Sequence, residues 1–166
     1  MSGSVGTALV ITVSTRAHQG VYADESGPVI ATLLTEAGFV VDGPQIVPDG
    51  QAVGWALRDG ITHGYEVIIT TGGTGLAPSD ETPEQTRPLL DKEIPQLAAE
   101  IARYGLAAGV PTAVLGRGLA GVAGRSLVVN LPGSVGGARD GMAVVAPLLP
   151  HVVAQLRGGD HPRPTR

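Results

Sequence analysis

The chain has 166 residues and a formal net charge of −4, with 43% hydrophobic and 16% charged residues. This composition supports a full hydrophobic core and excludes wholesale disorder. The length predicts a single domain over residues 1–166, with flexible tails at 1–6 and 159–166. Because aromatic residues make up only 3% of the chain, the core is expected to be aliphatic.

Several classes of protein are disfavoured by residue usage. Cysteine is absent, which excludes disulfide frameworks and thiol catalysis and is compatible with a cytoplasmic protein. Lys92 is the only lysine and there is no basic stripe, so we expect no nucleic-acid partner. No apolar run approaches the ~20 residues that span a bilayer, so we expect no membrane association.

The first half of the chain alternates strand-like and helix-like segments. Residues 7–13 are nearly all apolar, which predicts a strand buried on both faces. After a loop at 17–22, cap candidates at 24–27 and Gly38 bracket a predicted helix. The further predictions here are a strand at 39–47, a helix at 51–59 with Asp49 at its N-cap, and a strand at 66–71.

The second half begins with a predicted helix at 82–90, with Thr82 as its cap and Gln85 closing a capping box. The remaining predictions are a helix at 94–104, a strand at 112–115, a glycine-rich hairpin or loop at 116–124, a strand at 126–131, a helical stretch at 138–156 broken at Pro147 and Pro150, and a frayed tail from Gly158 to Arg166. This order predicts an α/β fold, a three-layer α/β/α domain around a mostly parallel central sheet.

The most informative stretch is 66–80, EVIITTGGTGLAPSD. A buried strand ends here in a glycine-rich turn, which contains Gly72, Gly73, Thr74 and Gly75 and precedes a helix. Glycines let backbone N–H groups approach a ligand, and a helix N-terminus favours negative charge. The stretch therefore predicts an anion-binding floor for an active site.

Two aspartates follow strands that we expect to be neighbours. Asp49 comes after the second strand, and Asp80 comes five residues after Gly75. If the sheet is parallel, both lie at its carboxyl edge, where they form a plausible Mg²⁺ site for phosphate chemistry. The alternative is that Asp49 only caps a helix and that Asp80 only shapes a turn. Each aspartate taken singly favours that alternative, whereas the accompanying glycine loop favours function.

Other residues offer weaker signals. The chain lacks the P-loop, dinucleotide and nucleophile-elbow motifs, and its histidines have no metal-ligand spacing. Arg16 follows the first strand and is the arginine we expect in the site, whereas Arg117, Arg125 and Arg139 are expected to be solvated. Trp55 is predicted to lie in the core face of a helix.

The motifs TTGGTGLAPSD-ETPEQT, the upstream VPDG and the downstream VPTAVLGRG and LVVNLPGS resemble the molybdopterin-binding, Mog/MoaB-like family. The similarity runs from Leu9 to about Asp160. It is closest to the stand-alone molybdopterin adenylyltransferases. The resemblance implies an α/β/α homotrimer in which the terminal phosphate of molybdopterin attacks the α-phosphate of Mg-ATP. The products are adenylyl-molybdopterin and pyrophosphate, and the pterin then passes to a molybdenum-insertion protein.

The resemblance also implies roles for individual residues. Asp80 and Asp49 would be catalytic and would hold Mg²⁺. The substrate- and phosphate-binding set would be Ser14, Gly72, Gly73, Thr74, Gly75, Asn130, Pro132, Gly133 and Ser134. Arg16 is added as a cation that offsets developing charge.

Two positions depart from the family pattern. Many relatives have Ser-Asp where this chain has Ser14-Thr15, and Ser-Arg where it has Gly116-Arg117. The departures favour an alternative function, a non-catalytic molybdopterin-binding or scaffold protein of the MoaB type. The presence of both Asp49 and Asp80 argues against it. A different Mg²⁺-dependent phosphotransferase is a third hypothesis, which substrate specificity would separate from the first.

Overall fold

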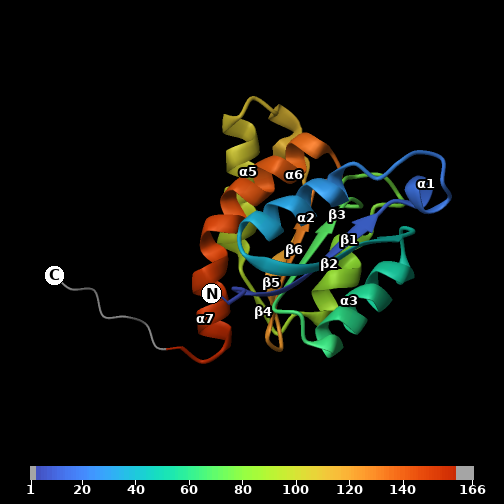
Figure 1. Cartoon of the computed structure of the whole chain (residues 1–166). Helices are drawn as coiled ribbons and strands as arrows, with labels where there is room; N and C mark the ends of the chain where they lie inside the picture. Colours follow the sequence, from blue (N-terminus) through green and yellow to red (C-terminus); the bar gives the residue numbers. More distant parts are fainter. Residues whose placement is uncertain (1–2, 160–166) are drawn as a thin grey trace.

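A computed structural model describes residues 3–159. Six strands form one sheet in the order β2-β1-β3-β6-β5-β4. The strands are β1 Gly6–Val13, β2 Phe39–Val47, β3 Val67–Thr71, β4 Lys92–Glu93, β5 Ala120–Ala123 and β6 Ser126–Leu131. The pairs β2–β1, β1–β3 and β3–β6 are parallel, whereas β6–β5 and β5–β4 are antiparallel. The predicted α/β fold with a mostly parallel sheet is confirmed (Figure 1).

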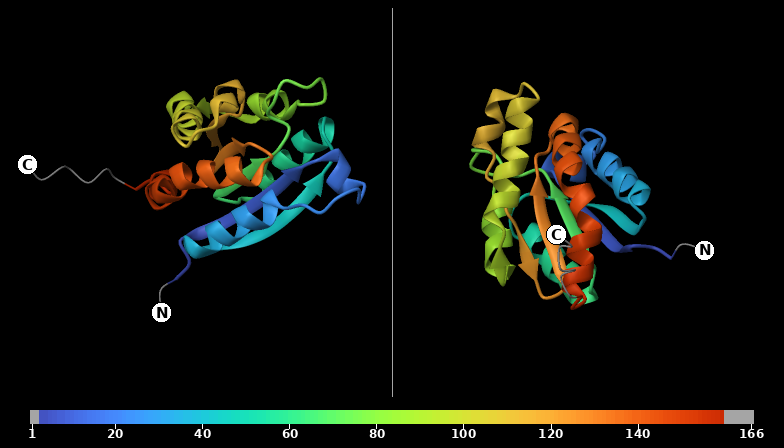
Figure 2. Two further views of the ribbon diagram at one scale, coloured as in Figure 1. Left: turned by 90° about the horizontal axis from the view of Figure 1, so that it is seen from above. Right: turned by 90° about the vertical axis from the view of Figure 1, so that its left-hand side faces the viewer.

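Helices cover both faces of this sheet (Figure 2). The longer helices are α2 Ser26–Glu36, α3 Gln51–His63, α5 Pro95–Ala107, α6 Val135–Val145 and α7 Leu149–Leu156. The shorter ones are α1 Thr15–His18, α4 Thr82–Thr86, and the 3-10 helices η1 Arg87–Leu89, η2 Pro111–Leu115 and η3 Ala146–Leu148. Within residues 3–159, no helix is long and apolar enough to cross a membrane.

The core is divided by the sheet into two aliphatic clusters. Side chains alternate along each strand, so Val10 and Ile69 face α2, α6 and α7, whereas Ile11 and Ile68 face α3. All four of these side chains have no solvent exposure. Strands buried on both faces explain why the sequence shows continuous apolar runs instead of alternation.

Two predicted elements differ in type from the structure. Residues 112–115 lie in η2 and not in a strand, because Pro111 fixes the φ of the first residue of a tight turn. The next strand is instead β5, which forms the predicted hairpin with β6 through Gly124 at φ +58°. The predicted loop at 17–22 begins with the last two residues of α1, whose N-cap Ser14 accepts a hydrogen bond from Ala17 N at 3.1 Å.

Helix boundaries also differ at prolines and caps. The predicted helix at 82–90 ends at Thr86 and continues as η1, which contains Pro88. The break at Pro147 is confirmed by η3, whereas Pro150 lies in the first turn of α7 and breaks nothing. The tail predicted for Gly158 to Arg166 lies almost wholly outside the described residues.

Three side-chain roles are corrected. Gly50, at φ +97°, is the N-cap of α3 in place of Asp49. Glu81, without a side-chain hydrogen bond, is the N-cap of α4, so Thr82 and Gln85 form no capping box. Trp55 is 64% exposed on the outer face of α3, because Val53, Ala56 and Leu57 occupy the inner face.

A candidate active site with two pockets at the carboxyl edge of the sheet

The loops that follow β1, β2, β3 and β6 meet at one edge of the sheet. These four strands are parallel neighbours, so their carboxyl ends face the same side. In Figure 1 this edge is marked by α1, opposite the end that carries the N-terminus and the end of α7. This confirms the predicted position of four segments at one edge of the sheet: Ser14, Asp49, the glycine loop and Ser134.

The glycine loop needs its glycines. Gly72 has φ +101° and Gly73 has φ +67°, conformations that other residues rarely adopt. A Cβ on Gly72 would lie 2.2 Å from the carbonyl oxygen of Val13. Thr82 forms two hydrogen bonds with the loop: its Oγ1 donates to Gly72 O at 3.0 Å, and its backbone N donates to Gly73 O at 3.0 Å. Two hydrogen bonds thus tie the loop to the start of α4.

Arg117 fixes the far side of the same loop, a role that the sequence interpretation missed. Its Nε donates to Gly75 O at 2.9 Å and its Nη2 donates to Asp80 O at 2.8 Å. Its Nη1 pairs with Glu84, and that hydrogen bond lowers the pKa of the Glu84 carboxyl. The partners lie 33 to 42 residues earlier in the chain, so no local pattern indicated them.

Asp49 is held by Thr15. The Thr15 hydroxyl donates to Asp49 Oδ2 at 2.8 Å and accepts from Asp49 N at 3.1 Å, and Thr15 N lies 3.3 Å from Oδ2. The other oxygen, Oδ1, faces the glycine loop, because a Cβ on Gly73 would lie 3.2 Å from it. Asp49 therefore presents one carboxylate oxygen towards the loop.

Asp80 lies across the loop. Its Oδ2 accepts from Ala77 N at 3.1 Å, and its backbone N donates to Ala77 O at 2.9 Å. These bonds close the turn, as the alternative interpretation of Asp80 expected. The carboxylate is nevertheless half-exposed and lines both pockets described below, so shaping the turn leaves it available to a ligand.

Asn130 is a structural member of the site. It is 3% exposed, and its Nδ2 donates to Thr70 Oγ1 at 3.0 Å and to Thr86 Oγ1 at 3.1 Å. Its Oδ1 accepts from Leu119 N at 3.0 Å. Through these three hydrogen bonds Asn130 ties β6 to β3, α4 and the approach to β5, and it supports the floor of the site.

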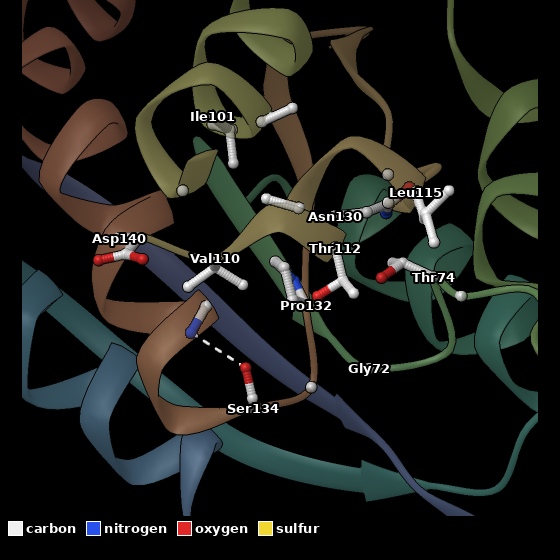
Figure 3. A pocket seen from close by; sticks show the side chains of 18 of the residues that line it. Gly72, Thr74, Ile101, Val110, Thr112, Leu115, Asn130, Pro132, Ser134 and Asp140 are labelled. Carbon is white, nitrogen blue, oxygen red and sulfur yellow. Dashed lines mark hydrogen bonds between the residues drawn. The ribbon is translucent and has the colours of Figure 1, made fainter. Parts of the chain in front are cut away.

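The loop after β6 closes against the glycine loop. Ser134 is the N-cap of α6 and accepts from Gly137 N at 3.0 Å, the bond drawn in Figure 3. The carbonyl of Pro132 accepts from Thr71 Oγ1 at 2.7 Å. A Cβ on Gly133 would lie 3.1 Å from Gly72 Cα, so the two glycine-containing turns are in direct contact.

Two pockets flank this contact. The smaller one, about 690 Å³, has mostly aliphatic walls from α5, η2 and the N-cap residue of η2, including Ile101, Leu115 and Val110 (Figure 3). Thr74 and Gly75 line only this pocket among the glycine-loop residues. Its far side is formed by the first turns of α6. The smaller pocket thus combines a glycine-rich floor with apolar walls.

The larger pocket, about 1130 Å³, is polar and contains Ser14, Arg16 and Asp49. Five residues line both pockets: Gly72, Gly73, Asp80, Gly133 and Ser134. Ligands in the two pockets would therefore meet at Asp80 and the glycine turns. The pockets bring together every residue that the sequence assigned to the site.

The acidic residues suit a magnesium ion that is shared with a ligand. Within residues 3–159, no group of three histidine or acidic side chains is arranged to hold a metal by itself. Mg²⁺ is usually bound by one or two carboxylates together with substrate phosphates. Asp49 and Asp80, lining one pocket, provide such a partial site, whereas Arg16 is the exposed cation beside it.

Comparisons with known proteins agree with this architecture. Residues 9–151 match the family model described as "Probable molybdopterin binding domain". The solved structure of the molybdopterin biosynthesis Mog protein from Mycobacterium ulcerans is 51% identical, with a TM-score of 0.86, over 91% of this chain and 99% of that chain.

Curated relatives agree as well. The molybdopterin adenylyltransferase of Pyrococcus furiosus is 37% identical over 153 residues, which cover 89% of this chain and 89% of that protein. The molybdenum cofactor synthesis protein cinnamon of Drosophila melanogaster is 41% identical over 159 residues, 91% of this chain. The chain spans only 25% of cinnamon, and 49% of the bifunctional molybdenum cofactor protein of Chlorobaculum tepidum. Since the family model covers most of the chain, the protein belongs to the molybdopterin-binding domain family of molybdenum cofactor biosynthesis.

Proposed function

We propose that this protein is a molybdopterin adenylyltransferase of molybdenum cofactor biosynthesis. The reaction would join the terminal phosphate of molybdopterin to the α-phosphate of ATP and release pyrophosphate. The observation that carries the proposal is the pair of pockets that share Asp80 and the two glycine turns. Two phosphate-bearing substrates, one in each pocket, would bring their phosphates together at that boundary.

The residues of this chain would act by positioning and by charge neutralisation. Backbone N–H groups of Gly73, Thr74 and Gly75 would bind the phosphate of molybdopterin, and Arg16 would lie beside the triphosphate. Asp49 and Asp80 would hold Mg²⁺, which would supply charge neutralisation at the phosphates when bound. No protein nucleophile is required, because the pterin phosphate is itself the attacking group.

Pyrophosphate release tests this proposal. Purified protein would be mixed with Mg-ATP, with and without molybdopterin, and pyrophosphate would be measured together with adenylyl-molybdopterin. We expect release that depends on molybdopterin, in a one-to-one ratio with the adenylylated product. Pyrophosphate without molybdopterin, or with an unrelated phosphate acceptor at equal rate, would contradict the proposal and would favour a different phosphotransferase.

A second candidate function is a non-catalytic molybdopterin-binding protein of the MoaB type. The observation that favours it is the Thr15 hydroxyl, which donates to Asp49 Oδ2 at a position where the family resemblance implies a second carboxylate. Thr15→Asp separates the two functions. An increase from no turnover to measurable pyrophosphate release would support the scaffold, whereas turnover in the unmodified protein excludes it.

The proposal includes an assembly. We propose a cytoplasmic homotrimer that passes adenylyl-molybdopterin to a molybdenum-insertion protein. Exposed apolar side chains on α5 and η2, including Leu106 at 48% and Val114 at 60%, are compatible with a protein contact. Light scattering at micromolar concentration is expected to give three times the 16.8 kDa chain mass, and a monomer would contradict this part of the proposal.

A further inference from the structure

One carboxylate in the smaller pocket has no role in the mechanism above. Asp140 lies on α6, is half-buried, and lines the pocket together with Ile101 and Val110 (Figure 3). Within residues 3–159 its carboxylate forms no hydrogen bond or ion pair with another side chain or with the backbone. The sequence interpretation did not single it out, because nothing in its local pattern marks it.

The other aspartates of the two pockets are engaged. Asp49 accepts from Thr15, Asp80 accepts from Ala77, and Asp24 accepts from Thr12 at 2.7 Å and from Gly27 at 3.0 Å. A carboxylate in partly apolar surroundings without a donor loses hydration and gains nothing in return. Asp140 is thus an acceptor placed against an apolar pocket wall, available to donors on a ligand.

The position of Asp140 along α6 determines its distance from the glycine turns. The helix begins at Val135, next to the glycine turns, and Asp140 is five residues further on, which is ~7.5 Å along a helix axis. An anion at the glycine turns and a hydrogen-bond donor at Asp140 would therefore belong to opposite ends of one ligand. A phosphate-bearing heterocycle of moderate length meets that requirement.

We propose that Asp140 is a specificity-determining residue that accepts two hydrogen bonds from the 2-amino group and N3–H of the pterin. This inference rests on the proposed function, in which Thr74 and Gly75 bind the molybdopterin phosphate; both residues line only the smaller pocket, so that pocket would take molybdopterin. A 2-amino-4-oxopyrimidine edge presents two adjacent donors, and a carboxylate presents two adjacent acceptors. Adenine places an acceptor, N1, beside its amino group, so its edge is not complementary to a carboxylate.

The first experiment compares two simple ligands that differ only at position 2. 6-Hydroxymethylpterin carries the 2-amino group, and 6-hydroxymethyllumazine carries a 2-oxo group in its place. Their dissociation constants would be measured by fluorescence with the full chain and with Asp140→Asn. We expect the unmodified protein to prefer the pterin by about tenfold or more, because the lumazine oxygen would face the carboxylate without a proton.

Asp140→Asn is expected to abolish or reverse this preference. An asparagine amide presents one donor and one acceptor, which match the 2-oxo group and N3–H of the lumazine. Asp59→Asn is the matched control, because Asp59 is an exposed aspartate on α3, outside both pockets. It should retain the preference of the unmodified protein. An equal preference in the unmodified protein and Asp140→Asn would overturn the proposal.

The second experiment uses molybdopterin itself at equilibrium, without turnover. Molybdopterin retained in dialysis would be quantified as its fluorescent oxidation product, and ATP binding would be measured in parallel. We expect Asp140→Asn to weaken molybdopterin binding about tenfold or more and to leave ATP binding unchanged. Unaltered molybdopterin binding, or a loss confined to ATP, would overturn the assignment. Because no step depends on adenylyl transfer, a failure of the proposed activity would leave both results interpretable.

Discussion

The charged side chains at the two ends of the central sheet differ in their partners: those at the amino end pair with each other, whereas those at the carboxyl end line the pockets. At the amino end, Arg157 Nε forms an ion pair with Glu66 Oε1 at 2.5 Å, and Glu66 Oε2 accepts a hydrogen bond from Thr7 N at 3.1 Å. At the carboxyl end, Asp49, Asp80 and Asp140 each keep at least part of their carboxylate directed at a pocket. The same strands thus carry an internally paired carboxylate at one end and carboxylates available to a ligand at the other. Groups that are not satisfied internally mark where a ligand is expected.

The largest effect is expected at the shared boundary of the pockets. Asp80→Asn keeps an oxygen for Ala77 N but removes the negative charge, so we expect adenylyl transfer to fall by about 10²–10³-fold or more. The melting temperature should stay close to that of the unmodified protein, because the turn is preserved. Turnover would be measured as pyrophosphate release. Unchanged turnover in the folded variant would show that Asp80 only shapes the turn.

Next in size is the effect of filling the glycine turn. Gly72→Ala places a Cβ against the Val13 carbonyl at φ +101°, so we expect a loss of about 3 kcal/mol in the free energy of unfolding. Gly136→Ala is the control, because no atom lies within 4 Å of its Cβ position. That change should be neutral or slightly stabilising in urea denaturation. Equal stabilities of the two variants would show that the turn is not fixed.

A smaller effect is expected when the far side of the loop is released. Arg117→Met removes three donors that hold Gly75, Asp80 and Glu84, so we expect transfer to fall by about 10-fold to 100-fold. Added guanidinium should restore part of the activity. Arg103→Met removes a comparable surface pair with Glu100 and should leave transfer unchanged. If both variants lose activity equally, the loop does not depend on Arg117.

The smallest effect is expected at the amino end of the sheet. The hydrogen bond from Arg157 holds the pKa of the Glu66 carboxyl below its usual 4.5. The contribution of the Arg157–Glu66 pair to the free energy of unfolding is therefore fully present above pH 4.5. It is lost as the pH falls through the lowered pKa of Glu66. Glu66→Gln should melt lower than the unmodified protein at pH 7, and the difference should shrink below pH 4.5. A difference independent of pH would mean that charge is not involved.

Local sequence patterns were reliable where burial or backbone conformation decides the structure. The apolar runs at 7–13 and 126–131 predicted strands correctly, because a parallel sheet covered on both faces needs continuous apolar residues. Pro147 predicted a helix break correctly, because proline has no backbone N–H to donate within a helix and its ring clashes with the preceding turn. The strand predicted at 112–115 was wrong, because four mixed residues carry too little periodicity to compete with the turn that starts at Pro111.

Caps and exposed faces were less predictable. Asp49 and Thr82 have the chemistry of N-caps, but each makes a tertiary hydrogen bond instead, Asp49 with Thr15 and Thr82 with the Gly72 carbonyl. Trp55 fits a helix core by hydrophobicity alone, although the inner face of α3 is already filled. In each case, contacts with residues distant in sequence outweighed a local preference.

The sequence by itself determined the four parallel strands, the glycine turn and the order of the loops along the chain, because burial and left-handed backbone conformations select residue types locally. Only the tertiary structure decided that Thr15 orients Asp49, that Arg117 holds the Asp80 loop, and that Asp140 faces the smaller pocket. These contacts join segments that are brought together by the parallel sheet. Their geometry depends on the register and packing of the whole domain, which no short stretch of residues specifies.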